Sequence, residues 1–323
     1  MSGFAYERPT TLAAALASVS LPNGRALPIA GGTDLLVWID EGLAAPERVV
    51  DVRGIPGLDE IVRRPDGSLR IGAAARIADI AAHAAVRDGF ALLAEACASV
   101  GTPALRNMGT IGGNLAQRPR CWYLRRGVAC FKNGGSGCAA VEGEHQYHGI
   151  LDDGTCRAVH PSDPAVALAA LGATVEISSV AGVRTVEVDR LYAGAASNPR
   201  AEVALEAGEL ITAVELPSAA AGGAHFWEKL MQRGAWDFAL VSCAAARRAD
   251  GEVRLVLGGV GLGPWVLSSS VAEDVGSGEL DEESIDALAE RALYDTSPLA
   301  GTEYKVTMAG ALLRRAMRAL AET

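Results

Sequence analysis

A short apolar run leads directly into a glycine-rich loop at Leu27-Pro28-Ile29-Ala30-Gly31-Gly32-Thr33-Asp34. A second glycine-rich loop lies further along the chain, at Gly109-Thr110-Ile111-Gly112-Gly113-Asn114. Glycine allows a backbone to approach a ligand closely, and its N–H groups can then point at phosphate oxygens. Neither loop matches a P-loop or Gly-x-Gly-x-x-Gly, so a Rossmann nucleotide site is not predicted. The loops indicate a phosphate-rich cofactor, with two structural tight turns as the alternative.

Four of the six cysteines fall within 36 residues with the spacing C-x8-C-x7-C-x17-C. They are Cys121, Cys130, Cys138 and Cys156. This spacing matches neither the C-x2–4-C pairs of zinc ribbons nor the C-x2-C runs of bacterial ferredoxins. Thiolates favour an iron–sulfur cluster or zinc, and His145, His148 and His160 are nearby as partial zinc ligands. From the residues alone, an iron–sulfur cluster, zinc and no metal all stay open.

Composition excludes several classes of protein. The chain has 323 residues, a net charge of −10 and 50% hydrophobic residues, which predicts a globular protein of two or three domains. Without a basic excess, nucleic acid is not expected as the main partner. No run of eighteen apolar residues occurs, and residues 1–9 do not resemble an export signal. We therefore expect no membrane span and a cytoplasmic location, with export on a partner's signal to the periplasm as the alternative.

The six cysteines are expected to be thiols and not disulfides. Six cysteines without an export signal favour thiol ligands over disulfides. Cys97 and Cys243 lie in apolar runs and are expected to be inert core thiols.

Sequence patterns predict a mixture of helices and strands, that is, the α+β class. Helices are expected at 13–19, 77–84, 90–100, 164–171, 282–293 and 304–320, the first capped by Thr10 or Thr11 and the fourth by Asp163. Strands are expected at 27–30, 48–52, 68–74, 174–177, 185–188 and 210–216. Ala249-Asp250-Gly251 predicts a hairpin between 239–247 and 252–260. The small-residue segment 217–223 is the expected domain boundary.

Several separate motifs together resemble one family. Pro28–Leu36, Asn107–Leu115 and His160-Pro161-Ser162-Asp163 resemble the FAD-binding medium subunit of the molybdenum hydroxylases, the relatives of xanthine dehydrogenase, carbon monoxide dehydrogenase and aldehyde oxidoreductase. Residues 238–242 and 257–260 resemble its C-terminal domain. The resemblance implies a two-part FAD-binding domain of the vanillyl-alcohol-oxidase and p-cresol-methylhydroxylase type at 1–218, and a C-terminal α+β domain with an antiparallel sheet at 219–323.

The cysteine segment, about 116–160, resembles an insertion carried by a subset of the family with an extra [4Fe–4S] cluster. That subset includes the 4-hydroxybenzoyl-CoA reductase β subunit and, most similar here, the FAD subunit of periplasmic-type aldehyde oxidoreductase. The resemblance therefore implies that Cys121, Cys130, Cys138 and Cys156 bind a [4Fe–4S] cluster.

The resemblance also implies a set of FAD contacts and no catalytic residue. The implied contacts are Ile29, Ala30, Gly31, Gly32, Thr33, Asp34, Leu35, Gly72, Asn107, Gly109, Thr110, Gly112, Gly113, Asn114, Asp163 and Lys229. Asp163 would lie near the adenosine end and Lys229 near the flavin; an N-cap and a solvated strand lysine are the alternatives. Tyr192 is expected to be a half-buried core residue, with stacking on the flavin as the alternative.

The expected function is electron transfer within a heterotrimer. A large subunit with the molybdenum cofactor would oxidise an aldehyde, and a small subunit with two [2Fe–2S] clusters would pass electrons to FAD and then to an external acceptor. Alternatives are a 4-hydroxybenzoyl-CoA-reductase-like or xanthine-type complex, a zinc-stabilised scaffold without flavin, and a stand-alone flavin oxidase. The sequence leaves open the substrate, the acceptor, the direction of electron flow and whether the cluster is a relay or a structural element.

Overall fold

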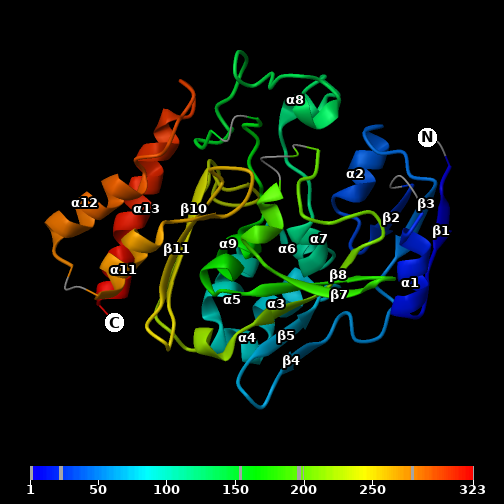
Figure 1. The fold of residues 1–323 in the computed structure, drawn as a ribbon, viewed down its shortest axis with the longest axis horizontal. Helices are drawn as coiled ribbons and strands as arrows, with labels where there is room; N and C mark the ends of the chain where they lie inside the picture. The colour runs from blue at the N-terminus through cyan, green and yellow to red at the C-terminus, as the bar shows by residue number, and fades with distance from the viewer. Residues whose placement is uncertain are drawn as a thin grey trace.

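The computed structural model describes residues 3–21, 25–152, 155–194, 198, 200–277 and 280–322. In this part of the chain, strands form three sheets with helices between and around them (Figure 1). The mixture of helices and sheets confirms the predicted α+β class. No helix among the described residues combines the length and the apolar character needed to cross a membrane.

The first sheet is parallel and carries the first glycine loop at the end of one strand. Its strands, in the order β1-β3-β2, are β1 (Ala5–Glu7), β2 (Ala26–Ile29) and β3 (Arg48–Asp51). Helix α1 (Leu12–Val19) packs against it, and Thr11 caps this helix by accepting a hydrogen bond from the Ala14 N–H at 3.2 Å. Helix α2 (Leu35–Asp40) begins directly after the loop. Neither β1 nor α2 was predicted, because three and six residues are too short for a periodic pattern.

The second sheet is antiparallel and joins segments from both sides of the cysteine segment. Its order is β4-β5-β8-β6-β7, and its strands are β4 (Ile61–Arg63), β5 (Leu69–Gly72), β6 (Thr174–Ser179), β7 (Gly182–Glu187) and β8 (Leu210–Leu216). Because β8 pairs with both β5 and β6, residues 73–173 form one excursion from a continuous sheet. The cysteine segment lies within that excursion.

Helices of this excursion cover the second sheet and form the largest core with it. They are α3 (Ile77–Ala82), α4 (Ala84–Gly89), α5 (Ala91–Ala98), α7 (Ile111–Leu115) and α9 (Asp163–Ala170). Helix α6 (Pro103–Arg106) belongs to the same excursion but has no buried residue. The cap of α9 is Ser162, whose Oγ accepts a hydrogen bond from the Ala165 N–H at 3.1 Å. The prediction that Asp163 caps this helix is therefore wrong by one residue, and its carboxylate is free for another contact.

The third sheet is antiparallel and is backed by the C-terminal helices. Its order is β12-β11-β10-β9, and its strands are β9 (His225–Leu230), β10 (Val241–Arg247), β11 (Val253–Gly258) and β12 (Trp265–Val266). The pairing of Arg247 with Val253 confirms the predicted hairpin. Helices α11 (Ser269–Ser277), α12 (Glu282–Ala292) and α13 (Glu303–Ala321) pack on one face. Helix α13 packs with an apolar face on the sheet, and four residues of that face are buried: Ala309, Leu313, Met317 and Leu320.

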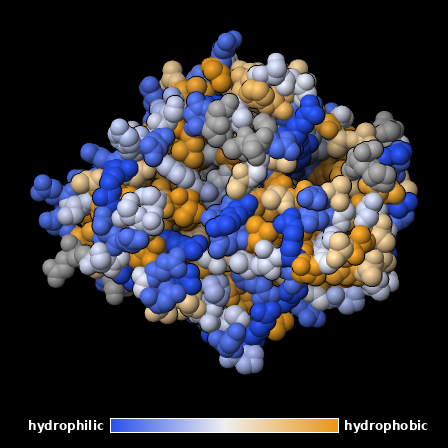
Figure 2. Space-filling view, in the orientation of Figure 1, coloured by the Kyte–Doolittle hydropathy of each residue, from blue (hydrophilic) through white to orange (hydrophobic). Residues whose placement is uncertain are grey.

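Helix α9 packs against β10 and β11, so the second and third sheets share core residues. The chain passes between them through the short turn η4 (Ser218–Ala220). Division into domains at residues 218 and 219 stays a prediction, because this shared core leaves open whether the parts fold separately. On the face of the molecule in Figure 2, hydrophobic and hydrophilic residues are interspersed in small patches.

Above the sheets, the cysteine segment forms an irregular layer (Figure 1). Its regular pieces are short, namely α8 (Trp122–Arg125) and the turn η2 (Phe131–Asn133). A further turn, η3 (Arg190–Tyr192), follows β7.

Candidate functional site

The two glycine loops contact each other through their backbones. A Cβ atom on Gly31 would lie 2.0 Å from the Met108 carbonyl oxygen and 2.9 Å from the Cα of Gly109. Gly32 has φ +72°, a conformation that a residue with a side chain rarely adopts. The sequence therefore places glycine where two chain segments meet without intervening side chains.

The second loop forms the start of α7. The Thr110 hydroxyl accepts a hydrogen bond from the Gly113 N–H at 3.3 Å, and a Cβ on Gly112 would lie 2.8 Å from that of Ala73. Asn114 accepts a hydrogen bond from the Ser162 hydroxyl at 2.6 Å. Gly112 thus packs inward, whereas Asn114 connects the loop to the segment that contains Asp163.

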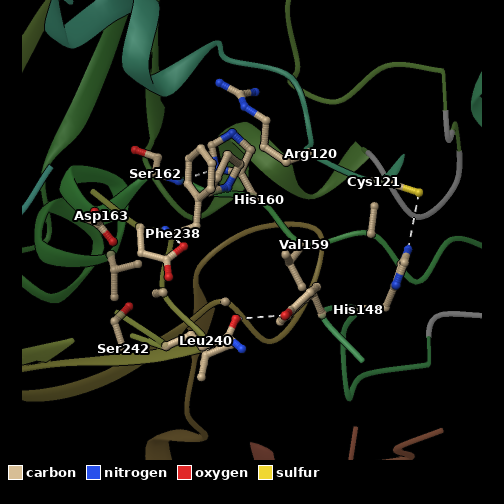
Figure 3. Close-up of a pocket in the computed structure, with 18 of the residues that line it drawn as sticks. Arg120, Cys121, His148, Val159, His160, Ser162, Asp163, Phe238, Leu240 and Ser242 are labelled. Atoms are coloured by element: carbon tan, nitrogen blue, oxygen red, sulfur yellow. Dashed lines mark hydrogen bonds between the residues drawn. The ribbon is translucent and has the colours of Figure 1, made fainter. Parts of the chain in front are cut away.

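A cavity of about 320 Å³ lies where the two halves of the chain and the cysteine segment meet (Figure 3). It is lined by residues 120–122, 147–148, 158–163, 232–233, 237–240 and 242, together with Val166 and Gly259. Two buried polar atoms on its wall, Ser242 Oγ and His148 Nδ1, have no hydrogen-bond partner among the described residues. Buried polar atoms are usually satisfied, so this wall has donors and acceptors to offer to a bound molecule.

A second cavity of about 330 Å³ lies beside the second glycine loop. It is lined by Arg53, Asp59, Ala74, Arg76, Asp79, Asn107, Met108 and Thr110. Arg53 pairs with Asp51 at 2.8 Å, and the carboxylates of Asp59 and Asp79 balance the two arginines, so the cavity is polar without a net positive charge. The predicted contacts Asn107 and Thr110 are therefore exposed to a polar cavity.

Asp163 and Lys229, both predicted as cofactor contacts, bind each other. Lys229 Nζ lies 2.7 Å from Asp163 Oδ2, and the two side chains are only 3% and 7% exposed. Lys229 also donates to the Ser99 carbonyl at 3.2 Å. Burial raises the pKa of Asp163, and the lysine opposes that rise. The alternative of a solvated Lys229 is wrong, because its side chain leaves the half-buried strand β9 to pair with Asp163 at the start of α9, away from water.

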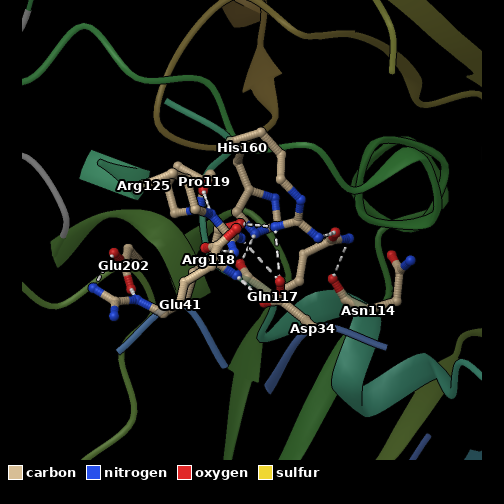
Figure 4. Close-up of polar contacts among 10 residues, drawn as sticks. Asp34, Glu41, Asn114, Gln117, Arg118, Pro119, Arg125, His160 and Glu202 are labelled. Atoms are coloured by element: carbon tan, nitrogen blue, oxygen red, sulfur yellow. Dashed lines mark hydrogen bonds and ion pairs between the residues drawn. The ribbon is translucent and has the colours of Figure 1, made fainter. Parts of the chain in front are cut away.

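Asp34, from the first glycine loop, points toward the cysteine segment (Figure 4). Its carboxylate accepts hydrogen bonds from the Arg118 N–H and from Arg125, both at 2.9 Å, and lies 3.0 Å from Arg120. Arg118 in turn pairs with Glu202 at 2.7 Å. In this arrangement the carboxylate anchors the cysteine segment to the first loop.

Trp38 of α2 is a further anchor that the sequence did not reveal. The guanidinium of Arg118 lies 3.8 Å and that of Arg125 4.2 Å from the centre of its ring. Such contacts stabilise a cation over an aromatic face. Only the fold brings these residues together, since more than 75 positions separate the tryptophan from either arginine.

The other predicted contacts lie around the loops but line neither of these two cavities. Ile29, Ala30, Thr33 and Leu35 flank or belong to the first loop, and Gly109 begins the second. Gly72 belongs to β5, where a Cβ would lie 2.3 Å from the Leu58 carbonyl oxygen. Close packing of two chain segments is therefore sufficient to explain glycine at that position.

All four clustered cysteines line one small cavity within the cysteine segment: Cys121, Cys130, Cys138 and Cys156. None of the six cysteines, all of which lie within the described residues, forms a disulfide. A hydrogen bond between the two thiols lowers the pKa of Cys138 and raises the pKa of Cys156. Among the described residues, no three His, Cys, Asp or Glu side chains converge on a point that could hold one metal ion. The thiols thus surround a space rather than a point.

The histidines near the cysteines differ in their contacts. His145 contacts the Ala140 carbonyl through Nδ1 and accepts from the Gly301 N–H through Nε2, so both nitrogens are engaged. His160 is likewise held through both nitrogens, by the Gln117 carbonyl and the Ser162 N–H. His148 alone of these three lies against a cysteine, with Nε2 3.2 Å from Cys121 Sγ. Burial lowers the pKa of His148 to about 4, which leaves its ring neutral near pH 7.

The remaining cysteines and Tyr192 are core residues. Cys97 and Cys243 are fully buried in separate clusters, as predicted, and burial raises the pKa of each thiol. Tyr192 is 4% exposed, and its hydroxyl donates to the Leu115 carbonyl at 2.9 Å. It is thus more deeply buried than expected.

Comparison with known proteins identifies the family. Residues 2–219 match the model of the FAD binding domain in molybdopterin dehydrogenase, and residues 227–320 match the CO dehydrogenase flavoprotein C-terminal domain. The chain belongs to this family of FAD-binding flavoprotein subunits. The predicted family and cofactor FAD are thereby confirmed: this is the FAD-binding subunit of a molybdenum-dependent oxidoreductase.

Individual relatives agree with that family. The aldehyde oxidoreductase FAD-binding subunit PaoB of Escherichia coli (strain K12) is 41% identical over 84% of this chain and 86% of its own length. The carbon monoxide dehydrogenase medium chain of Afipia carboxidovorans is 29% identical over 97% of this chain and 95% of its own. A crystal structure of the Cu,Mo-CO dehydrogenase superimposes with a TM-score of 0.75 at 26% identity, covering 100% of this flavoprotein subunit and 99% of that chain.

Proposed function

We propose that this flavoprotein subunit transfers electrons from a molybdenum-bearing partner to an external acceptor, within a complex that oxidises an aldehyde. The observation that carries the proposal is the polar cavity beside the touching glycine loops, together with the larger cavity lined by Asp163. The 41% identity to an aldehyde oxidoreductase FAD-binding subunit supports the aldehyde as substrate.

The arrangement of the loops fits an extended dinucleotide. We assign the pyrophosphate to the two glycine loops, since the absence of side chains at Gly31, Gly32 and Gly113 lets ligand oxygens approach the backbone closely. The N–H groups of residues 111–114 donate within the chain, so the second loop contributes this close approach and not N–H donors. The cavity beside Arg53 and Arg76 suits the adenosine end. The cavity beside Asp163 suits the flavin ring, so Asp163, which the resemblance placed near the adenosine end, is assigned together with Lys229 to the flavin end. When bound, FAD supplies the ability to accept and release electrons singly or in pairs.

This chain's own residues would orient the flavin and control its surroundings. The Asp163–Lys229 pair has its charges balanced internally, so it adds a fixed dipole to the cavity wall. Ser242 Oγ, which has no partner among the described residues, can hydrogen-bond to a polar edge of the ring. The centre of the Phe238 ring lies 5.3 Å from the guanidinium carbon of Arg120, and the ring offers an apolar face that limits access of water to the cavity.

The four clustered cysteines are proposed as the ligands of one [4Fe–4S] cluster. Their common cavity supports this, because a cubane needs four thiolates around a volume, whereas zinc needs four donors around a point. Engagement of both nitrogens of His145 and of His160 also argues against a mixed zinc site. The zinc-stabilised scaffold is the less favoured alternative.

The proposed partners are a large subunit with the molybdenum cofactor and a small subunit with two [2Fe–2S] clusters. Names of the relatives support a multisubunit enzyme, since one is a FAD-binding subunit and another a medium chain. A cytoplasmic location, or a periplasmic one reached on a partner's signal, stays a prediction.

Purification of the chain alone and with its co-expressed partners tests these assignments. We expect one noncovalent FAD per chain, released by acid, and four irons and four sulfides on this subunit after anaerobic preparation. Stoichiometric zinc without iron would overturn the cluster but not the flavin site. Aldehyde turnover by the isolated chain would overturn the subunit assignment and favour a stand-alone oxidase.

The substrate class is tested on the complete complex with an artificial electron acceptor. An aromatic aldehyde, xanthine and 4-hydroxybenzoyl-CoA are offered separately, with reduced donor present for the last. Turnover is expected with the aldehyde. Preferential turnover of xanthine or of the thioester would replace the aldehyde assignment with the corresponding alternative.

A further inference from the structure

Cys121 lies on the boundary between the two internal spaces of the cysteine region. It lines the small cavity shared by the four clustered cysteines, and it also lines the large cavity assigned to the flavin ring. Cys130, Cys138 and Cys156 line only the small one of these two cavities. Cys121 is therefore the thiol at the shared wall.

His148 reaches this thiol from the side of the large cavity (Figure 3). Its Nε2 lies 3.2 Å from Cys121 Sγ, within the range of a hydrogen bond to sulfur. Its Nδ1 has no partner among the described residues, so the sulfur is the one polar atom that they offer to the ring. The side chain is buried, with the residue 3% exposed, and a hydrogen bond there is little weakened by water.

Packing fixes the orientation of the His148 ring. The ring of Trp122 stands against it at 5.4 Å between centres and 77° between planes, and that of Tyr123 lies 6.1 Å away. The His148 N–H donates to the His145 carbonyl at 2.8 Å, which closes a turn that His145 itself attaches to Gly301. The imidazole is thus held in place by contacts that do not involve the sulfur.

A sulfur that ligates iron carries no proton and can only accept a hydrogen bond. Nε2 must then carry the proton, and the contact is N–H···S. Hydrogen bonds to ligand sulfurs are one of the factors that set the reduction potential of an iron–sulfur cluster. An added electron increases the negative charge on the sulfurs, so a donor stabilises the reduced form.

We propose that His148 is a positioning residue that donates a hydrogen bond from Nε2–H to Cys121 Sγ and thereby raises the reduction potential of the [4Fe–4S] cluster. The inference rests on the proposed cluster and deepens it, because it names the ligand nearest to the flavin cavity. One electron enters or leaves the cluster, while the imidazole keeps its proton and no bond at His148 is formed or broken.

The test is a potentiometric titration of the complete complex, monitored by electron paramagnetic resonance, in the parent protein and three variants. His148→Leu removes the donor, and the cluster midpoint potential is expected to become more negative. His148→Gln keeps an amide N–H at similar reach and is expected to restore most of the shift. His145→Gln is the matched control, because His145 belongs to the same turn but contacts no thiol. The flavin midpoint potential serves as an internal reference in each sample.

The outcomes separate this inference from the cluster itself. Absence of iron from the unmodified subunit overturns the proposed cluster, whereas full iron with an unchanged cluster potential in His148→Leu overturns only the role of His148. An equal shift in His145→Gln also overturns it, because loosening of the turn would then be the cause.

A second measurement does not depend on folding of the variants. The unmodified complex, with this subunit labelled with ¹⁵N-histidine, is reduced and examined by pulsed paramagnetic resonance. Of the chain's five histidines, His148 is the one that contacts a clustered cysteine in the structure. A ¹⁵N coupling to the reduced cluster is expected, and its absence would contradict the hydrogen bond.

Discussion

Glycines of the two loops serve different purposes at the residue scale. Gly31 and Gly112 face other parts of the chain, because a Cβ would lie 2.0 Å from the Met108 carbonyl oxygen or 2.8 Å from the Ala73 Cβ. Gly113 differs, since its nearest neighbour is the Thr110 hydroxyl at 3.2 Å and its φ is not positive. Substitution at Gly113 can therefore disturb a ligand without disturbing the fold.

Gly113→Val is expected to weaken FAD binding by about tenfold or more, equivalent to roughly 1.4 kcal/mol. The branched side chain would occupy the space through which the pyrophosphate approaches the backbone of the loop. Acid-released FAD per chain and a fluorescence titration of the depleted complex measure the effect. Gly3→Val is the matched control, because no atom lies within 4 Å of its Cβ position. Full FAD occupancy in Gly113→Val would remove the second loop from the pyrophosphate site.

Lys229→Met should destabilise the protein by about 3–5 kcal/mol, because it leaves the carboxylate of Asp163 buried without its partner. Without the lysine, the pKa of Asp163 in the folded state rises further above its unfolded value. As pH falls through that pKa, the folded variant binds a proton at Asp163 that the unfolded variant does not yet bind. The loss in free energy of unfolding caused by Lys229→Met therefore becomes smaller. Chemical denaturation at several pH values measures this. The double variant with Asp163→Asn should lose less stability than Lys229→Met alone. A greater loss of stability at low pH than at neutral pH in Lys229→Met would contradict the expected effect of the buried carboxylate.

At the scale of structural elements, the cysteine segment has little regular structure and depends on contacts with the helices and loops around it. Helix α2 provides Trp38 and the preceding loop provides Asp34, and both contact arginines of the segment. On the other side, Tyr304 of α13 donates to the Gln146 carbonyl at 2.7 Å. A segment with short helices and few ladder hydrogen bonds opens more easily than a core strand. Its cavity therefore depends on these anchors.

Asp34→Asn is expected to lower the iron content and speed proteolysis within residues 121–152. The substitution removes the charge from a carboxylate with three partners, and hydrogen bonds to charged groups contribute about 1.5–3 kcal/mol each. Limited proteolysis and iron analysis measure the two effects. Asp40→Asn, on an exposed residue at the end of α2, is the matched control. If only FAD were lost and the segment stayed protected, Asp34 would be a flavin contact and not an anchor.

At the scale of the whole molecule, the third sheet and the cysteine segment meet around the large cavity, and a buried lysine helps to join them. Lys305 of α13 is 1% exposed and donates to the Gly259 carbonyl at 2.9 Å and the Tyr147 carbonyl at 3.2 Å. No acidic side chain among the described residues pairs with it. Burial lowers the pKa of Lys305 to about 7. The ammonium thus connects the third sheet to the cysteine segment at a cost in free energy.

The contribution of Lys305 to stability should depend on pH. Between its folded pKa of about 7 and its usual value of 10.5, the unfolded chain binds one proton more than the folded chain. Stability therefore rises with pH in this window, by at most about 1.4 kcal/mol per pH unit. Denaturation at pH 7 to 10 measures the free energy of unfolding of the parent and of Lys305→Met. The value for the parent should rise relative to that of the variant as pH increases. A difference independent of pH would show that the pKa of Lys305 is not lowered in the folded protein.

Local patterns in the sequence are enough to predict much of the fold and the presence of a flavin site. The hairpin around Asp250, the apolar face of α13 and the glycine loops are visible because turn chemistry and helical periodicity act over a few residues. The cysteines could be grouped by their position along the chain, and the family could be recognised from motifs in a fixed order. Each of these depends on neighbours in sequence.

Tertiary structure alone decides what these residues contact. It directs Asp34 to the cysteine segment, pairs Asp163 with Lys229, and places Cys121 between two cavities with His148 against it. The partners in the first two cases are more than 60 positions apart, and no local pattern specifies which of many polar groups will meet after packing. The sequence by itself determined that the chain carries two glycine-rich loops and clustered thiols. The fold determined how they face each other, because burial forces every charge and donor to find a partner among the groups that packing brings within reach.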